Sequence, residues 1–205
     1  MDLKIEKVVV GEIETNCYVV IKDNNCFIVD PGAEAKKIKE LVGKHRIQFI
    51  LLTHGHFDHV LALMDMKMIY PEADIYIGRG DKNLLSHLSE QSYFIGQRLR
   101  DIKLPLKLVK EGDLIKFDHE IITVIETLGH SLGSVCYKVG KNLFSGDTMF
   151  YHSIGRTDLP TSDSKLMERS LQKLADLPAD TKVFPGHMQE TTIIEEKTLG
   201  FLANI

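Results

Sequence analysis

Apolar and polar positions along the chain fall into short blocks, and the period of each block indicates the element that it forms. The first half predicts five short strands, over 4–11, 16–21, 26–30, 48–54 and 74–78. Two helices lie among them, over 32–45 and 60–70. In the first helix, Ile38, Leu41 and Val42 recur at helical spacing. The apolar run within 48–54 is typical of a strand buried on both faces.

The second half is again rich in strands, predicted within 107–117, 120–130, 134–140, 141–147 and 181–187. Helices are predicted over 163–177, with Asp163 as a candidate N-cap, and over 191–202. Residues 79–105 are polar and helix-prone, with no clear pattern. Two strand-rich blocks with helices predict an α+β fold, an αββα sandwich with helices outside two packed sheets. The 205 residues suffice for a single domain, which we assign to 1–205.

Composition narrows the class of protein. Hydrophobic residues make up 43% and charged residues 26%, an ordinary balance for a globular protein. The sequence holds no apolar run of roughly 20 residues and no apolar leader near its start, so we expect a cytoplasmic protein with no membrane partner. The net charge of −4, with Lys and Arg dispersed, argues against a nucleic-acid partner. A small-molecule partner remains, and the sequence does not predict the oligomeric state.

Three cysteines, Cys17, Cys26 and Cys136, each lie in an apolar strand-like run. None forms a C-x-x-C pair, which argues against a cysteine metal site. We expect buried, reduced thiols.

The stretch LLTHGHFDHV, residues 51–60, concentrates potential metal ligands: His54, His56, Asp58 and His59. A loop leaving a strand points alternate side chains one way, so His54 and His56 can reach one ion. Where the chain then enters a helix, Asp58 and His59 can turn toward a neighbouring point. Imidazole and carboxylate suit zinc or iron. The alternative, a polar surface loop, leaves this density of ligands unexplained.

Further ligands are offered by His130, Asp147 and His187, each at a strand end beside a glycine. A single Gly-His or Gly-Asp pair is usually only a turn, but a sandwich can gather such loops at one edge. We therefore take all three as candidate ligands. The remaining histidines lack this context and are interpreted as surface or helix-end residues: His45, His87, His119 and His152. For His152, which lies near Asp147 in the sequence, a place in the cleft is the alternative.

The ordered motifs H-x-H-x-D-H, G-H, S-G-D and P-G-H resemble those of the metallo-β-lactamase superfamily, and within it the compact glyoxalase II-like hydrolases. GEIETNCYVV, IVDPGAEA and SIGRTDLP support the resemblance, which covers nearly the whole chain. It implies the metallo-β-lactamase fold, with two mixed sheets flanked by helices.

The resemblance also implies two divalent metal ions, zinc or else iron or manganese. The first would be held by His54, His56 and His130. The second would be held by Asp58, His59 and His187. Asp147 would bridge both ions, and catalytic roles fall to Asp58 and Asp147. A metal-held hydroxide would then attack a substrate carbonyl.

Other positions carry weaker signals. Asp30 is either a turn residue or a carboxylate that orients a ligand loop. Arg156 and Asp158 lie either in a surface turn or on the active-site rim, and the resemblance favours the rim. Arg156 is the candidate partner of a substrate carboxylate. We place 79–101 near the cleft as a hypothesis, and Tyr18 in the core. Leu128 and Leu132 stand where similar chains carry proline.

The predicted function is a dinuclear hydrolase of small acyl compounds, foremost a thioester such as S-lactoylglutathione. A lactone or other ester is the near alternative. An iron-dependent persulfide dioxygenase-type oxidoreductase is a rival, since its ligand motifs overlap. A nuclease is disfavoured by the net charge, and a non-catalytic binding module by the complete ligand set. About 18 residues follow His187, so we expect no C-terminal helical domain that grips glutathione.

Overall fold

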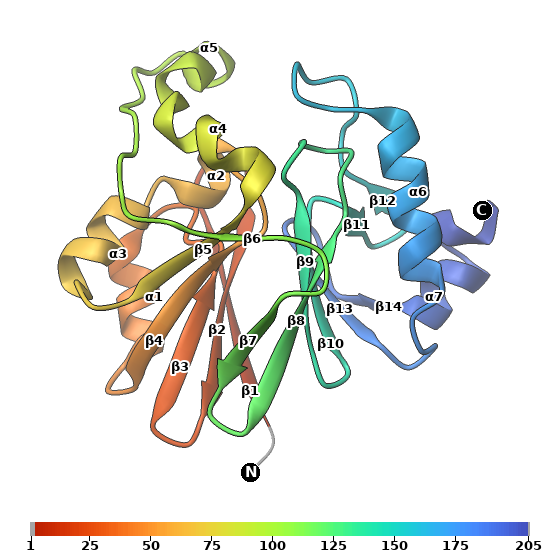
Figure 1. Cartoon of the computed structure of the whole chain (residues 1–205), viewed down its shortest axis with the longest axis horizontal. Coiled ribbons are helices and arrows are strands. Elements are labelled where there is room, and N and C mark those ends of the chain that lie inside the picture. Colours follow the sequence, from red (N-terminus) through yellow and green to blue (C-terminus); the bar gives the residue numbers. More distant parts are fainter. Residues whose placement is uncertain (1–2, 205) are drawn as a thin grey trace.

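The computed structural model describes residues 3–204 and contains two mixed six-stranded sheets packed face to face with helices on both outer sides (Figure 1). The first sheet has the order β1 (Lys4–Val10), β2 (Thr15–Lys22), β3 (Asn25–Val29), β4 (Arg46–Leu52), β5 (Asp74–Gly78) and β6 (Lys107–Val109). The second has the order β14 (Thr191–Thr192), β13 (Lys182–Pro185), β10 (Asn142–Gly146), β9 (Val135–Val139), β8 (Glu120–Glu126) and β7 (Leu114–Phe117). The predicted αββα sandwich is thereby confirmed.

Helices cover the outer faces of the two sheets (Figure 1). On the first sheet lie α1 (Ala35–Val42) and α3 (Leu63–Ile69). Toward its upper edge lie α2 (Phe57–Val60), α4 (Lys82–Ser86) and α5 (Ser92–Ile95). The short helices η1 (Arg79–Asp81) and η2 (Leu88–Gln91) flank α4 in the chain. On the second lie α6 (Ser164–Ala175), α7 (Ile193–Thr198) and η3 (Phe201–Asn204). A two-stranded ribbon completes the fold, from β11 (Met149–Phe150) and β12 (Ser153–Ile154). None of the helices within 3–204 is long and apolar enough to cross a membrane.

The alternating pattern of β4 explains why this strand lies at the centre of the first sheet. Ile50 and Leu52 point into the core beneath the helices, whereas Phe49 and Leu51 point into the core between the sheets. Side chains that alternate between two apolar layers produce the unbroken hydrophobic run seen in the sequence. β4 is parallel to both of its neighbours, β3 and β5, so the ends of these strands share one edge.

Two buried tyrosines join the sheets at the same end of the sandwich. The hydroxyl of Tyr18, on the first sheet, donates to the carbonyl of Pro185 on the second at 2.7 Å. The hydroxyl of Tyr137, on the second sheet, donates to the carbonyl of Leu52 on the first at 3.0 Å. A buried hydroxyl needs such a partner, because leaving it unpaired costs about 1–3 kcal/mol. The prediction that Tyr18 is a core residue is confirmed.

Several element boundaries differ from the sequence prediction. The single block 107–117 divides between the sheets, because β6 pairs with β5 of the first sheet and β7 with β8 of the second. The turn at Gly112, with φ +78°, makes that crossing. The predicted helix 191–202 shortens to α7, whose N-cap Thr192 bonds the backbone N–H of Glu195. The Asp163 N-cap of α6 is confirmed, since its carboxylate accepts from the N–H of Lys165 at 2.9 Å.

Candidate metal centre

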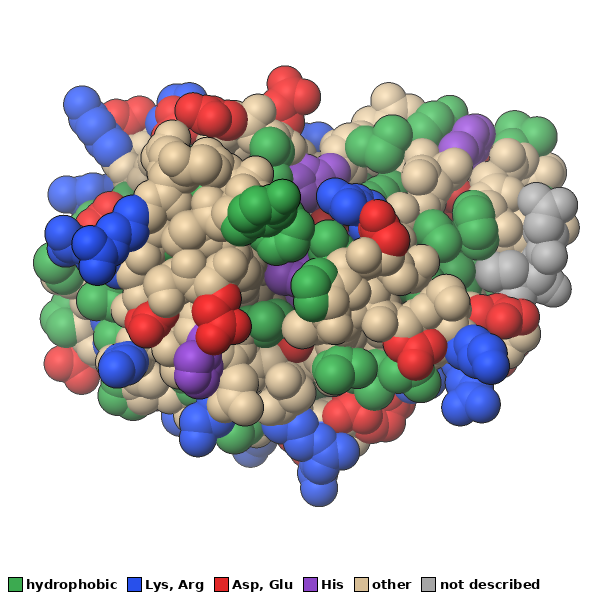
Figure 2. Space-filling model, turned by 90° about the horizontal axis from the view of Figure 1, so that it is seen from above, with side chains coloured by type: hydrophobic (Ala, Val, Ile, Leu, Met, Phe, Trp, Pro, Cys, Tyr) green, Lys and Arg blue, Asp and Glu red, His purple; other side chains and the backbone are tan. Residues whose placement is uncertain are grey.

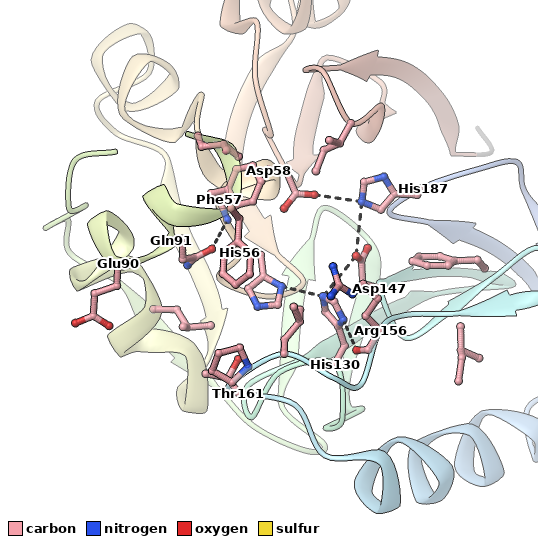
Figure 3. A pocket seen from close by; sticks show the side chains of 18 residues that line it. His56, Phe57, Asp58, Glu90, Gln91, His130, Asp147, Arg156, Thr161 and His187 are labelled. Carbon is pink, nitrogen blue, oxygen red and sulfur yellow. Dashed lines mark hydrogen bonds and ion pairs between the residues drawn. The ribbon is translucent and has the colours of Figure 1, made fainter. Parts of the chain in front are cut away.

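The predicted ligands come together at one edge of the sandwich, although they are far apart in the sequence. Five of them are labelled in Figure 3: His56, Asp58, His130, Asp147 and His187. His54 follows β4 directly, and the chain then enters α2, which carries Asp58 and His59. The second sheet contributes the others from loops that follow its strands: His130 after β8, Asp147 after β10 and His187 after β13. Strand ends that share one edge bring these loops together, as the sequence predicted.

The first group consists of His54, His56 and His130, whose ligand atoms all lie within 4.8 Å of one another. His56 Nδ1 and His130 Nε2 are 2.8 Å apart. Within the described residues, the buried Nε2 of His54 has no hydrogen-bond partner. These three nitrogens can therefore converge on one ion.

The second group consists of Asp58, His59 and His187, again within 4.8 Å of one another. Asp58 Oδ2 lies 3.2 Å from His187 Nε2 and 3.2 Å from His59 Nε2. One carboxylate oxygen and two imidazole nitrogens can thus surround a second ion.

Asp147 stands between the two groups. Its Oδ1 lies 3.3 Å from His59 Nε2 of the second group, and its Oδ2 lies 3.5 Å from His130 Nε2 of the first. Among the described residues, Asp147 Oδ1 and His59 Nε2 are buried without a hydrogen-bond partner. Buried polar atoms are rarely left unpaired, so these atoms fit a centre completed by cations.

Side-chain electrostatics within the cluster act differently on its individual histidines. Burial, together with the neighbouring imidazoles, holds the pKa of His54 well below its ordinary value, and burial lowers the pKa of His56 to about 4. For His59 burial also opposes the charged form, but the carboxylates of Asp58, Asp147 and Asp30 raise its pKa well above the ordinary value. Neutral imidazoles and ionised carboxylates are the forms that bind metal, so His54 and His56 are already in the ligating state at neutral pH.

Asp30 holds His59 in place from beneath the centre. Its Oδ1 accepts from the backbone N–H of Thr53 at 2.7 Å, and its Oδ2 accepts from the Thr53 hydroxyl at 2.6 Å. The same Oδ2 lies 2.9 Å from His59 Nδ1, which leaves Nε2 of His59 directed at the other members of the second ligand group. Asp30 also has a left-handed φ of +50°. The two interpretations left open by the sequence, turn residue and orienting carboxylate, therefore both hold.

His130 is oriented by the loop that follows β12. Its Nδ1 donates to the backbone carbonyl of Arg156 at 2.9 Å, so Nε2 is left to face the first group. His54 Nδ1 lies 3.1 Å from the hydroxyl of Thr53. Both contacts fix which ring nitrogen faces the centre, as partners of metal-binding histidines do.

Sequence reasoning missed two buried polar residues from 79–105. Asp81 Oδ2 accepts from the N–H of Gly55 at 2.8 Å and from the hydroxyl of Ser131 at 2.6 Å, which ties together the loops of His54, His56 and His130. Burial raises the pKa of Asp81. Gln91 accepts from the N–H of Phe57 and donates to the carbonyl of Gly55. The signal for Asp81 was its place just after β5, since parallel β4 and β5 end at the same edge.

A cavity of about 490 Å³ opens above the metal groups. Seen from above, hydrophobic and histidine side chains gather around a hollow near the middle of this face (Figure 2). Its floor includes His56, Asp58, His130, Asp147 and His187. Its walls come from the η2–α5 segment and from the β11–β12 ribbon with the loop that follows, as the hypothesis for 79–101 and the GRTDLP loop required.

Arg156 lines this cavity, but its guanidinium already has a partner. Its Nε and Nη2 each lie 2.9 Å from an oxygen of Asp158, a two-bond pair on the exposed rim. The pair lowers the pKa of the Asp158 carboxyl. A substrate carboxylate would have to compete with Asp158 for Arg156.

The remaining predictions concern residues away from the centre. His152 is not part of the cavity lining, and its Nε2 lies 3.0 Å from Glu195 Oε1. The cysteines are buried free thiols, as predicted: Cys17, Cys26 and Cys136.

Similarity to known proteins extends over nearly the whole sequence. A model of the metallo-beta-lactamase superfamily matches residues 10–187. The hydroxyacylglutathione hydrolase GloC of Haemophilus influenzae is 33% identical over 202 residues, which cover 95% of each chain. The crystal structure of TTHA1623 in a di-iron-bound form has a TM-score of 0.87 at 31% identity, over 96% of this chain and 99% of that one. The crystal structure of the BLEG-1 B3 metallo-beta-lactamase has a TM-score of 0.88 at 33% identity, over 95% and 96%.

Proposed function

The chain belongs to the metallo-β-lactamase superfamily of hydrolases, and we therefore propose that it hydrolyses small acyl compounds, foremost thioesters, with the help of two divalent metal ions. S-Lactoylglutathione is the reference substrate, because the relative GloC is named as a hydroxyacylglutathione hydrolase. Zinc suits the imidazole and carboxylate groups, and iron is the alternative suggested by the di-iron form of TTHA1623.

One observation supports this proposal most strongly: the two ligand groups adjoin one another, with the Asp147 carboxylate between them and the cavity above. Seven side chains are too many for one tetrahedral ion. Two ions with a shared carboxylate would supply Lewis acidity and an ionised water for attack on a carbonyl.

The chain's own groups have three tasks in such a reaction. Asp30 and the Arg156 carbonyl keep His59 and His130 in one orientation. Asp81 holds the loops of the first group at a fixed separation. The apolar walls of the cavity exclude water from the substrate, which strengthens electrostatic interactions at the centre. No serine or cysteine nucleophile is required, and the buried thiols lie outside the cavity lining.

The test is metal quantification on protein purified without added metal, together with a screen of thioesters and lactones. We expect about two metal ions per chain, thioester hydrolysis, and loss of activity on chelation. His152→Asn is the matched control, because this histidine lies outside the cavity lining and asparagine tolerates its left-handed φ of +52°, so neither metal content nor rate should change. A single iron per chain, oxygen consumption and indifference to His187→Ala would instead favour the oxidoreductase alternative.

A further inference from the structure

The part of the cavity beyond the metal groups has few charges. Within the described part of the chain, the charged lining residues other than the proposed ligands are Glu90 and Arg156. Arg156 is held by Asp158, so the rim presents two carboxylates and one guanidinium that is already paired. A substrate with several carboxylates, such as a glutathione thioester, would find no free cation there.

The rest of the lining is largely apolar, and it comes from two sides. The η2–α5 segment with α4 contributes Leu84, Phe94 and Ile95. The loop before α6 contributes Leu159 and Pro160. In Figure 1 the α4–α5 region and this loop rise on opposite sides of the upper edge. An elongated apolar group could therefore be enclosed between them.

Phe94 is the most informative of these residues, because folding does not account for it. The helix α5 buries none of its side chains, and Phe94 is 49% exposed while lining the cavity. Its neighbour Tyr93 is 90% exposed and is not part of the lining. An aromatic side chain that contributes little to the core but faces the cavity has surface available for a ligand.

Resting on the proposed function, we propose that this site prefers acyl compounds whose group remote from the carbonyl is uncharged and apolar, gripped between Phe94 and Leu159. Glutathione thioesters are then accepted at the carbonyl but not favoured through their peptide portion. Binding energy from such remote contacts is what separates substrates that share one reactive carbonyl.

The test uses thioethers, which cannot be hydrolysed, so that binding is measured independently of catalysis. Isothermal titration calorimetry on the metal-loaded protein compares S-methyl- and S-hexyl-N-acetylcysteamine, which are uncharged, with S-hexylglutathione. Five additional methylenes, partly buried, should tighten binding of the hexyl probe over the methyl probe by about tenfold or more. S-Hexylglutathione should bind no more tightly than its uncharged counterpart.

Variants locate the grip. Phe94→Ser, at an exposed position that folding does not require, should reduce the ratio of the hexyl-probe affinity to the methyl-probe affinity by about threefold or more. Leu159→Ser should act likewise from the opposite wall. Met68→Ser, at a position that is 71% exposed and outside the cavity lining, is the control and should leave the ratio of affinities unchanged. Glu90→Gln should improve binding of S-hexylglutathione relative to the uncharged hexyl probe.

Two results would overturn the inference: equal affinity for the methyl and hexyl probes, or S-hexylglutathione binding about tenfold tighter than the uncharged hexyl probe, equivalent to about 1.4 kcal/mol. Failure of the proposed function would look different. It would appear as no turnover of S-acetyl- or S-hexanoyl-N-acetylcysteamine or of S-lactoylglutathione by the metal-loaded protein, whatever the calorimetric ratios.

Discussion

Replacing Asp30 by asparagine isolates the role of one carboxylate beneath the metal centre. Asparagine has the same size, and it tolerates the left-handed φ of +50° that position 30 adopts, so the backbone should not be strained. Alanine would strain this left-handed backbone and also remove the carboxylate, so the two causes could not be separated. The substitution converts one acceptor oxygen of the carboxylate into an NH₂ donor.

The size of the expected loss follows from the three groups that contact the Asp30 carboxylate: the Thr53 N–H, the Thr53 hydroxyl and His59 Nδ1. If the NH₂ faces the Thr53 N–H, now 2.7 Å from Oδ1, two donors oppose one another and one is left unpaired. If it faces His59 Nδ1, now 2.9 Å from Oδ2, the imidazole must accept there and carry its proton on Nε2, where the metal should bind. The first arrangement costs about 1–3 kcal/mol of folding stability. The second weakens metal binding at the second group by roughly 10- to 100-fold.

Asp23→Asn is the matched control, because Asp23 has φ +52° in an exposed turn away from the centre. Urea denaturation of the metal-free protein measures the first effect, and zinc titration against a competing chelator measures the second. We expect Asp30→Asn to lose stability or affinity for the second ion, with a smaller effect on the first ion, because Asp30 reaches His54 only through the Thr53 hydroxyl. If Asp30→Asn matched Asp23→Asn in both measurements, the orienting role of Asp30 would be refuted.

Four further outcomes are expected. Asp147→Asn should lower the content of both metal ions, whereas His187→Ala should chiefly remove one; elemental analysis that shows equal losses would contradict the assignment of Asp147 as the shared ligand. Chelation should lower the melting temperature, because the ions bind the folded chain far better than the unfolded one; an unchanged calorimetric transition would argue against metal binding. Burial raises the pKa of Cys26 to about 12 and that of Cys136 to about 11, from 9.0. The folding stability that comes from keeping these thiols protonated is therefore complete below pH 9 and is lost as the pH rises toward those values. A thiol reagent at pH 8 should modify them only after denaturation. Arg156→Ala should raise KM for a carboxylate-bearing thioester only modestly, because Asp158 already occupies the guanidinium, and it should change metal content little; a fall in kcat alone would show another role.

Much of the fold could be predicted because its strands are continuous apolar runs, such as that of β4, bounded by turn residues. The ligands could be predicted because each belongs to a short motif at a strand end. The helix predicted over 60–70 was less accurate. α2 begins already at Phe57, directly after the extended His56, and α3 starts afresh at Leu63. The entry into a helix at Asp58 and His59 was expected from the ligand motif, but the break between α2 and α3 has no apolar period to reveal it.

Long-range pairing limited the prediction elsewhere. Short strands such as β6 have no pattern that distinguishes one sheet from the other, and only the contact with β5 decides. Asp81 and Gln91 belong to no motif, and their importance comes from the ligand-loop backbone groups that they contact, which no local pattern displays. The pairing of Arg156 with Asp158 is local, but the GRTDLP stretch allowed a simple surface turn as well as a place on the rim, and only the resemblance favoured the rim.

The division of the candidate ligands between the two sheets would make each of the two proposed ions a long-range cross-link. In the first group, His56 and His130 are 74 residues apart, and in the second, Asp58 and His187 are 129 apart. Neither half of the chain supplies more than two members of either group of three. Each ion would close a long loop of the chain, as a disulfide bond does in a disulfide-bonded protein. We therefore expect metal retention to be a late event in folding, because the halves must dock before either proposed ion has three protein ligands.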